Sequence, residues 1–164
     1  MTTDALDPAA VRLLQENGAA VLLDLRPPTA FVRGHPTGAL SVPFSARGLG
    51  QRARIAVPST DTAIVLVAPD EPTADDAAAQ LAASGIQVRG SLDGGFAAWQ
   101  EAGLPTARLV EVAIEELPRL SARDTVVDVR EPLEWSTGHV PGALLIPPVV
   151  ELAWHHRVYI GPDA

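Results

Sequence analysis

The chain has 164 residues, of which 47% are hydrophobic, and it carries a formal net charge of −8 with an isoelectric point near 4.8. This acidity argues against a nucleic-acid partner. No apolar run approaches the roughly 20 residues of a membrane span, and the start of the sequence lacks the features of a signal peptide. We therefore expect a cytoplasmic protein with no membrane partner. The chain contains no cysteine, which excludes disulfides, thiolate metal sites and a cysteine nucleophile from its own residues.

A helix and a buried strand are the first elements that the sequence predicts. Asp7 suits the N-cap of the helix and Pro8 its first turn, where the missing N–H has no partner to lose. Residues 20–25 form a short aliphatic run without alternation, which is typical of a buried strand in a parallel sheet. Residues 45–59 contain glycine and arginine, and they predict an irregular segment.

The middle of the chain predicts a second strand–helix–strand series. Residues 63–68 (AIVLVA) give the strongest signal for a buried strand. A helix is expected to begin at Thr73, which has an acidic residue three positions later in the manner of a capping box. Residues 86–88 predict a further strand, and the turn at residues 93–95 leads into a helix that ends at Gly103.

One stretch of the sequence occurs twice. Residues 24–43 (DLRPPTAFVRGHPTGALSVP) and residues 128–147 (DVREPLEWSTGHVPGALLIP) share nine residues at a constant separation of 104 positions, and Phe31 is matched by Trp135. In each copy an aliphatic strand ends in Asp-x-Arg, a proline opens a short helix and a glycine ends it. An internal repeat of this kind constrains the architecture before any local propensity is considered.

This arrangement resembles the rhodanese-like domain family, in which strand, D-x-R, helix, G-H-[IV]-P-G-A and strand open the domain. The second copy, GHVPGA, fits this pattern, and the first, GHPTGA, shifts the proline by one position. The later segments GGFAAW (residues 94–99) and AGLP (residues 102–105) also resemble the family. A-P-D-E followed by a half repeat is similar to the tandem rhodanese region of metallo-β-lactamase-fold/rhodanese fusion proteins, although the metal-binding histidine motif of that catalytic domain is missing.

The resemblance implies an α/β, rhodanese-like fold: a parallel-stranded sheet flanked by helices on both faces, with a partial second rhodanese repeat. We expect one complete domain over residues 1–105, a linker over 106–109 and the partial repeat over 110–164. A free piece of about 55 residues buries little apolar surface. We therefore expect the partial repeat to pack on the first domain, on a protein partner or on a second copy of the chain.

The resemblance also implies where the chemistry would lie. Active members carry a cysteine at the end of the central strand, followed by a loop whose N–H groups hold an anionic sulfur. Counting back through the helix puts Ala68 at the cysteine position, while prolines remove N–H donors from the loop and carboxylates add negative charge. We expect no catalytic residue and no cofactor here, only a vestigial loop formed by Ala68, Pro69, Asp70, Glu71, Pro72 and Thr73.

Other polar residues favour structural roles. The repeated motif residues Asp24, Arg26 and His35, with Asp128, Arg130 and His139, are expected to hold the turns by hydrogen bonds or salt bridges, with an anion site at either arginine as the alternative.

Two groups of residues are candidates for a metal or contact site. A Ca²⁺ site among the acidic residues 70–76 would lack a closed cage because prolines stiffen the loop and glycine is absent from it. His155 and His156 are adjacent and point apart, which disfavours a shared metal, and Trp154 with Tyr159 predicts either a contact surface or a satellite core. We therefore expect no metal site.

The sequence is compatible with two functions, or with a decayed or truncated gene product that has no independent activity. The first is a catalytically silent rhodanese-like module that acts in binding, regulation or assembly in sulfur metabolism. The alternative is a component of a thiosulfate or persulfide sulfurtransferase that takes its cysteine from another chain.

Overall fold

The computed structural model describes residues 2–57, 61–110, 112–119 and 125–147, and the chain divides into two compact units, residues 1–108 (unit 1) and 109–164 (unit 2). The candidate contact residues Trp154, His155, His156 and Tyr159 lie outside the described residues. No described helix is long and apolar enough to cross a membrane.

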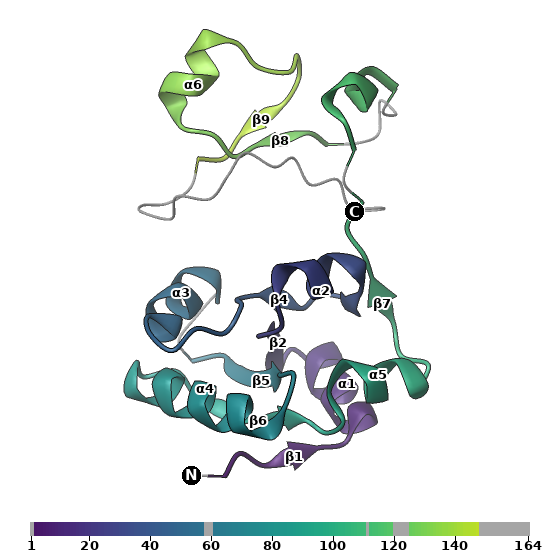
Figure 1. Cartoon of the computed structure of the whole chain (residues 1–164), viewed down its shortest axis with the longest axis vertical. Helices are drawn as coiled ribbons and strands as arrows, with labels where there is room; N and C mark the ends of the chain where they lie inside the picture. The colour runs from purple at the N-terminus through teal and green to yellow at the C-terminus, as the bar shows by residue number, and fades with distance from the viewer. Residues whose placement is uncertain (1, 58–60, 111, 120–124, 148–164) are drawn as a thin grey trace. The chain divides into compact units, whose positions relative to one another are not determined.

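A five-stranded sheet forms the centre of unit 1, and all of its strand pairs are parallel. Its order is β1-β6-β5-β2-β4, which places the two most aliphatic strands side by side in the middle (Figure 1). The strands are β1 (Ala5–Leu6), β2 (Ala20–Asp24), β4 (Leu40–Ser41), β5 (Ala63–Val67) and β6 (Val88–Leu92). Strands β2 and β5 pair over five residues, from Ala20 opposite Ala63 to Asp24 opposite Val67.

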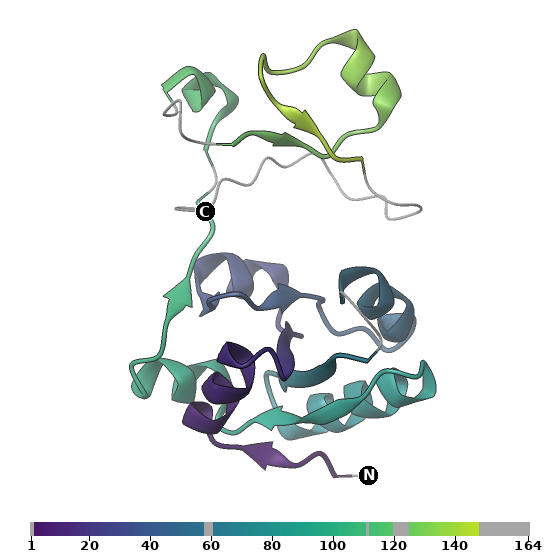
Figure 2. The same cartoon turned by 180° about the vertical axis from the view of Figure 1, so that it is seen from behind.

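Helices cover both faces of this sheet, as Figures 1 and 2 show from opposite sides. Helices α3 (Leu49–Ala56) and α4 (Glu71–Ala83) lie on one face, and α1 (Pro8–Glu16) and α5 (Gly95–Glu101) lie on the other. Helix α2 (Pro28–Arg33) connects β2 toward β4. The expected α/β fold, a parallel sheet flanked by helices on both faces, is therefore confirmed.

The face under α3 and α4 carries the main apolar core. Buried aliphatic side chains of the strands pack there against small side chains of the helices, and alanine lets α4 approach the sheet closely. The buried members of this core cluster are Leu23, Leu25, Val42, Leu49, Ala53, Val57, Ile64, Leu66, Ala74, Ala77, Ala78, Leu81 and Ile86.

A second, two-stranded sheet closes the end of unit 1. Strand β3 (His35–Pro36) pairs antiparallel with β7 (Thr106–Ala107), so two residues of the expected linker form a strand. The buried Trp99 donates its indole N–H to the Pro105 carbonyl at 2.9 Å, which fixes the chain just before β7.

Three predicted boundaries were wrong. Helix α3 occupies part of the expected irregular segment over residues 45–59, since Leu49 and Ala53 pack into the core. Strand β6 runs over Val88–Leu92 rather than residues 86–88, because Gly90 lets β1 approach: a Cβ there would lie 2.6 Å from the Asp4 carbonyl oxygen. Helix α4 begins at Glu71, before Thr73, because Asp70 is its N-cap.

Unit 2 repeats the opening of unit 1 on a smaller scale. Its described elements are the 3₁₀ helix η1 (Ile114–Arg119), strand β8 (Val127–Asp128), helix α6 (Pro132–Thr137) and strand β9 (Leu144–Leu145). Strands β8 and β9 pair in parallel, as β2 and β4 do in unit 1.

Candidate functional site

The candidate site lies at the carboxyl edge of the unit 1 sheet, where the connections after two neighbouring strands diverge. The chain leaves β2 toward β4 on one side and leaves β5 toward β6 on the other. Ligands of open α/β sheets bind at such a switch point. The backbone N–H of Leu25 donates to the Val67 carbonyl at 2.9 Å. This bond holds the two diverging loops together, with Arg26 on one side and Ala68 on the other.

Ala68 directly follows the central strand β5 and is half-buried. Its carbonyl oxygen faces the start of α5, where a Cβ added to Gly95 would lie 3.1 Å away. Gly95 has φ +59°, in the left-handed region that favours glycine. The side chain at the end of the central strand is therefore a methyl group, in a place where the backbone of two loops is closely packed.

The N-terminus of α4 is occupied by a carboxylate of the chain itself. Asp70 caps this helix, and its Oδ1 accepts the Thr73 backbone N–H at 2.8 Å. Hydrogen bonds from the side chain and the backbone of Thr73 lower the pKa of Asp70. Glu71 adds a second acid in the first turn, and Pro72 has no N–H to offer. An incoming anion would meet negative charge and few free donors here.

Asp24 and Arg26 form a fixed ion pair on the other side of the switch point. Arg26 Nε lies 2.9 Å from Asp24 Oδ1, and Arg26 Nη2 lies 2.5 Å from Oδ2 and 2.8 Å from the Gly34 carbonyl oxygen. The Asp24 side chain is fully buried, and that of Arg26 is 12% exposed. The Phe96 ring covers the guanidinium, with its centroid 4.3 Å from Arg26 Cζ. The Nε and Nη2 donors of Arg26 are thus engaged in hydrogen bonds within unit 1.

His35 stabilises the turn after α2. Its Nδ1 lies 2.8 Å from the Phe31 carbonyl oxygen, and its ring stacks on the Phe31 ring with centroids 3.7 Å apart. The side chain is buried. A histidine held on both sides in this way is suited to a structural role rather than to acid–base work.

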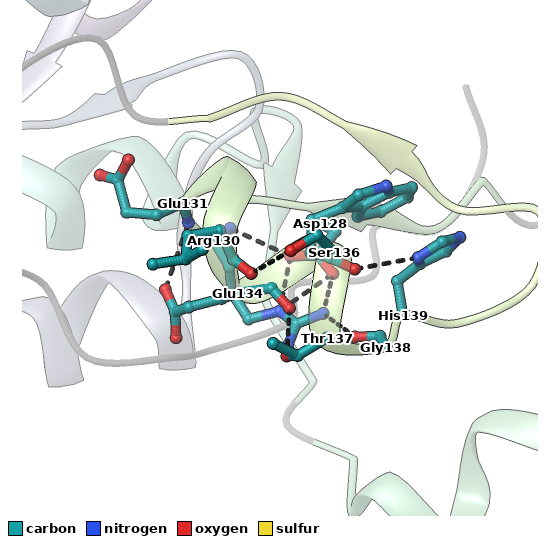
Figure 3. Close-up of polar contacts among 10 residues, drawn as sticks. Asp128, Arg130, Glu131, Glu134, Ser136, Thr137, Gly138 and His139 are labelled. Carbon is teal, nitrogen blue, oxygen red and sulfur yellow. Dashed lines mark hydrogen bonds and ion pairs between the residues drawn. The ribbon is translucent and has the colours of Figure 1, made fainter.

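The second copy of the motif has the same hydrogen bonds in unit 2 (Figure 3). Arg130 Nε lies 2.9 Å from Asp128 Oδ1, and Arg130 Nη2 lies 2.6 Å from Oδ2 and 2.9 Å from the Gly138 carbonyl oxygen. The hydrogen bonds from Arg130 lower the pKa of Asp128, and the same contact raises that of Arg130. His139 Nδ1 lies 3.2 Å from the Trp135 carbonyl oxygen and its ring stacks on Trp135.

The two copies differ in how well they are covered. The Arg130 side chain is 30% exposed, against 12% for Arg26. In the part of the chain that the structure describes, no aromatic ring covers Arg130 as Phe96 covers Arg26. The local fold of the motif therefore forms without the element that shields it in unit 1.

The acidic residues near α4 are engaged separately. Asp75 Oδ1 accepts the Thr3 backbone N–H at 2.6 Å, and this bond is the main cause of its lowered pKa. Asp70 is committed to its cap. Within the described ranges, no three His, Asp or Glu side chains meet in a group suited to a metal ion.

Of the sequence-predicted residues, the structure brings residues 68–73 and the Asp24–Arg26 pair to one sheet edge, and residues 71–73 of the expected loop form the first turn of α4. His35 lies in β3, and the second motif lies in unit 2. Sequence reasoning missed the contributions of Phe96 and Gly95 to this edge. The GGF pattern at the start of the expected helix was the available signal, since a glycine pair before an aromatic residue indicates a close approach of backbone.

Comparison with known proteins adds sequence and structural relatives. The family model described as rhodanese-like domain matches residues 7–102 and 113–159. An uncharacterized protein of Synechocystis is 32% identical over 107 residues, which span 65% of this chain and 58% of that protein. A putative thiosulfate sulfurtransferase of Synechococcus elongatus is 30% identical over 181 residues, spanning 85% of this chain and 56% of its own length. The chain thus spans little more than half the length of these two relatives.

A shorter relative and two solved structures are also similar to this chain. The thiosulfate sulfurtransferase GlpE of Pseudomonas aeruginosa is 33% identical over 99 residues, which span 60% of this chain and 86% of that protein. The crystal structure of the Alr3790 protein of Anabaena has a TM-score of 0.55 at 26% identity and covers 70% of this chain and 86% of its own. The solution structure of a rhodanese-like domain from the same protein has a TM-score of 0.53 and covers 93% and 98%. At 23% identity, that second likeness shows the fold alone.

Proposed function

The chain belongs to the rhodanese-like domain family, and we propose that unit 1 is a binding or regulatory module of sulfur metabolism that does not itself transfer sulfur. Relatives named as sulfurtransferases support the association with sulfur. The observation that carries the proposal is the methyl group of Ala68: it directly follows the central strand, where the resemblance places the cysteine of active members, and it precedes a helix capped by Asp70.

The chemistry explains why this replacement matters. Sulfur transfer through a covalent intermediate needs a thiolate, and the ordinary thiol pKa of about 8.5 has to be lowered by nearby donors or cations. Ala68 offers no thiol, and the chain has no cysteine elsewhere. Asp70 and Glu71 would raise rather than lower the pKa of a thiol placed there, because like charges disfavour the charged form.

Binding of the anion tests the proposal separately from turnover. Thiosulfate is titrated into the purified chain in a calorimeter at low ionic strength, with a cysteine-containing sulfurtransferase of the family as the positive control. We expect no saturable heat at millimolar thiosulfate, because carboxylates occupy the entrance to α4. Saturable binding in that range, abolished by excess sulfite or sulfate, would contradict the proposal.

One observation favours the second candidate function, a sulfurtransferase component that takes its cysteine from another chain. The Asp24–Arg26 pair, with the Phe96 ring over the guanidinium, lies at the same carboxyl edge of the sheet as Ala68, which offers no nucleophile. To separate the two candidates, the chain is added at increasing ratios to a cysteine-containing sulfurtransferase, and thiocyanate formation is followed. A rate that rises and saturates with the added chain favours the second function, and an unchanged rate favours the silent module.

We propose that unit 2 binds the partner of the module. Its partner would be a protein or a second copy of the chain rather than nucleic acid or a membrane, and the setting would be the cytoplasm. Among the described residues of unit 2, the exposed large hydrophobic side chains are those of Val110, Ile114, Val129, Leu133, Leu144 and Ile146. Exposed apolar side chains in such a small unit support an interaction role.

A further inference from the structure

Positive charge is concentrated in one stretch of this acidic chain. Residues 25–60 contain five of the 12 arginines and none of the 20 acidic residues. Three of these arginines, Arg47, Arg52 and Arg54, lie in helix α3 or directly before it. A net charge far from zero keeps a chain soluble, and these arginines reduce that charge. Their grouping therefore indicates a local interaction rather than a contribution to solubility.

Hydrogen bonds hold two of the arginines where α3 packs against α4 (Figure 1). Arg54 Nε donates to the Ser84 carbonyl oxygen at 2.9 Å, at the C-terminal end of α4. Arg52 Nη2 donates to Ser45 Oγ at 2.6 Å, and the Ser45 carbonyl oxygen accepts from Gln80 Nε2 at 3.1 Å. The Gln80 carbonyl oxygen in turn accepts from Ser84 Oγ at 3.0 Å. One hydrogen-bond network therefore joins the two guanidinium groups.

No carboxylate neutralises these three arginines in the part of the chain that the structure describes, where the ion pairs involve other arginines. Arg47 and Arg54 are exposed, and Arg52 is half-buried. Ser45 Oγ donates to the Arg47 carbonyl oxygen at 2.6 Å, so the residue before α3 belongs to the same network. Among the described residues, the Nη1 groups of Arg52 and Arg54 and the whole guanidinium of Arg47 have no partner. These donors are available to a ligand.

An exposed apolar side chain lies beside these charges. Ile55 follows Arg54 in α3 and is 51% exposed, whereas Leu49 of the same helix is fully buried in the core. Arginine is enriched at the centre of protein–protein interfaces, which is otherwise mainly apolar. Helix α3 thus combines the two kinds of group that such an interface uses. We call Arg47, Arg52, Arg54 and Ile55 the arginine surface.

We propose that the arginine surface binds an acidic segment of another protein. The carboxylates of that segment pair with the three guanidinium groups, and one of its aliphatic side chains covers Ile55. The planar guanidinium presents its donors in a fork that matches a carboxylate, which allows two parallel hydrogen bonds in one pair. The hydrogen bonds to Ser45 and Ser84 already hold two of the three arginines, so less side-chain freedom is lost on binding.

Charge and size favour a short acidic segment over other partners. At physiological ionic strength, exposed charges more than roughly 8 Å apart are largely screened, so a short segment responds to the local arginines rather than to the net charge of −8. A nucleic acid extends beyond three arginines and meets the acidic remainder of the chain. A second copy would have to supply carboxylates, and on its α4 Asp70 and Asp75 already accept backbone N–H groups. This inference does not depend on whether unit 1 transfers sulfur.

The test uses a fluorescent peptide in which glutamate and aspartate alternate with leucine, and its anisotropy is measured while the full chain is titrated. The same peptide with glutamine and asparagine in place of the acids is the control. We expect saturable binding of the acidic peptide and not of the uncharged one. Raising the salt from about 0.1 M to about 1 M shortens the Debye length from roughly 10 Å to roughly 3 Å and should weaken binding at least tenfold.

Charge reversal on the arginine surface should weaken binding, and the same change elsewhere should not. Arg47→Glu should lower the affinity for the acidic peptide at least fivefold, Arg47→Gln by a smaller factor, and Ile55→Gln about twofold through loss of the apolar contact. Arg12→Glu is the matched control, because it changes the net charge equally on α1, which lies on the opposite face of the sheet; it should leave the affinity unchanged. Circular dichroism checks that each variant is folded, and Arg47→Gln keeps the test valid if Arg47→Glu is not.

Four results would overturn the proposal. The first is no saturable binding of the acidic peptide, or equal binding of the uncharged one. The second is an equal effect of Arg47→Glu and Arg12→Glu, since net charge and not the arginine surface would then govern binding. The third is a single-stranded RNA of the same length that binds more tightly than the peptide and displaces it, since the partner would then be a nucleic acid. The fourth is self-association of the chain that Arg47→Glu abolishes, since the occupant would then be a second copy.

Discussion

Asp70 and Thr73 are joined at the first turn of α4: the Asp70 carboxylate accepts the Thr73 backbone N–H at 2.8 Å. The N-terminus of a helix is a natural place for an anion because its first N–H groups lack partners within the helix. Here the anion is the protein's own side chain. The loop after the central strand is therefore stabilised by the charge that would repel a sulfur anion.

Removing this cap should destabilise unit 1. Asp70→Ala is expected to lower Tm by about 4 °C at pH 7, since an N-cap acid is replaced by a residue that cannot accept the N–H. Asp76→Ala is the matched control, because Asp76 is an exposed acid on the same helix and is not its cap. It should leave Tm nearly unchanged. Equal losses from the two substitutions would show that the cap contributes nothing specific.

The benefit of the Asp70 cap should depend on pH in one direction. The hydrogen bonds from Thr73 lower the pKa of Asp70 below its usual 3.8 in the folded chain. A depressed carboxyl pKa gives stability that is present above the unfolded value and is lost as the pH falls through the folded value. The Tm difference between wild type and Asp70→Ala should thus be constant from pH 5 to 7 and shrink below pH 4. A difference that grows on acidification would contradict the assigned contact.

Restoring the thiol alone should not restore the chemistry. In Ala68→Cys we expect turnover below about 1% of that of a cysteine-containing relative and a thiol pKa at or above about 8.5, because Asp70 and Glu71 disfavour the thiolate. The pH dependence of alkylation by iodoacetamide measures that pKa. The variant that also carries Asp70→Gly and Glu71→Gly should show a lower thiol pKa. Strong turnover from Ala68→Cys alone would show that the loop carboxylates are not inhibitory.

The buried ion pair predicts unequal effects in the two units. Arg26→Ala leaves the fully buried Asp24 carboxylate without its partner, and we expect a loss of about 3 kcal/mol in the free energy of unfolding. Arg130→Ala should change stability much less, because water reaches the more exposed pair in unit 2 and screens the charge. Urea denaturation followed by circular dichroism measures both. A larger loss of stability from Arg130→Ala than from Arg26→Ala would mean that the exposure of the ion pair does not determine how much it contributes to stability.

Equivalent apolar positions should also respond differently. Leu25→Ala should lower the free energy of unfolding by about 2–5 kcal/mol, because it opens a cavity in the unit 1 core. Val129→Ala should change the free energy of unfolding by less than about 0.5 kcal/mol, as substitutions at exposed sites usually do. The same urea titrations compare the two, and a large loss from Val129→Ala would show that this side chain is covered in the isolated chain.

The parts of the fold that sequence could predict are those in which local pattern and tertiary packing agree. The aliphatic strands β2 and β5 and the Asp7-Pro8 start of α1 lie where the pattern indicated. The repeated motif was visible because both copies keep residues with special backbone or hydrogen-bonding roles. Asp24 and Asp128, for example, accept the backbone N–H groups of Arg26 and Arg130, each at 3.0 Å.

The parts that sequence could not predict depend on contacts between distant segments. Helix α3 has no side-chain cap and contains Gly50, and it is held by packing against α4, since a Cβ at Gly50 would clash with Ser84. The two-residue strands β3 and β7 exist only because they pair with each other. At the site, the position of Phe96 over Arg26 joins segments 70 residues apart in sequence, and no local pattern encodes it.

Thiocyanate formation from thiosulfate and cyanide by the purified chain is the decisive measurement for the assignment of a silent module. The reaction is followed with a blank that lacks protein and with a cysteine-containing sulfurtransferase as the positive control. A chain with Ala68 at the end of β5 should form thiocyanate at the rate of the blank at every protein concentration. A rate that exceeds the blank and rises in proportion to the amount of chain would mean that sulfur is transferred without a cysteine, and the assignment would be wrong.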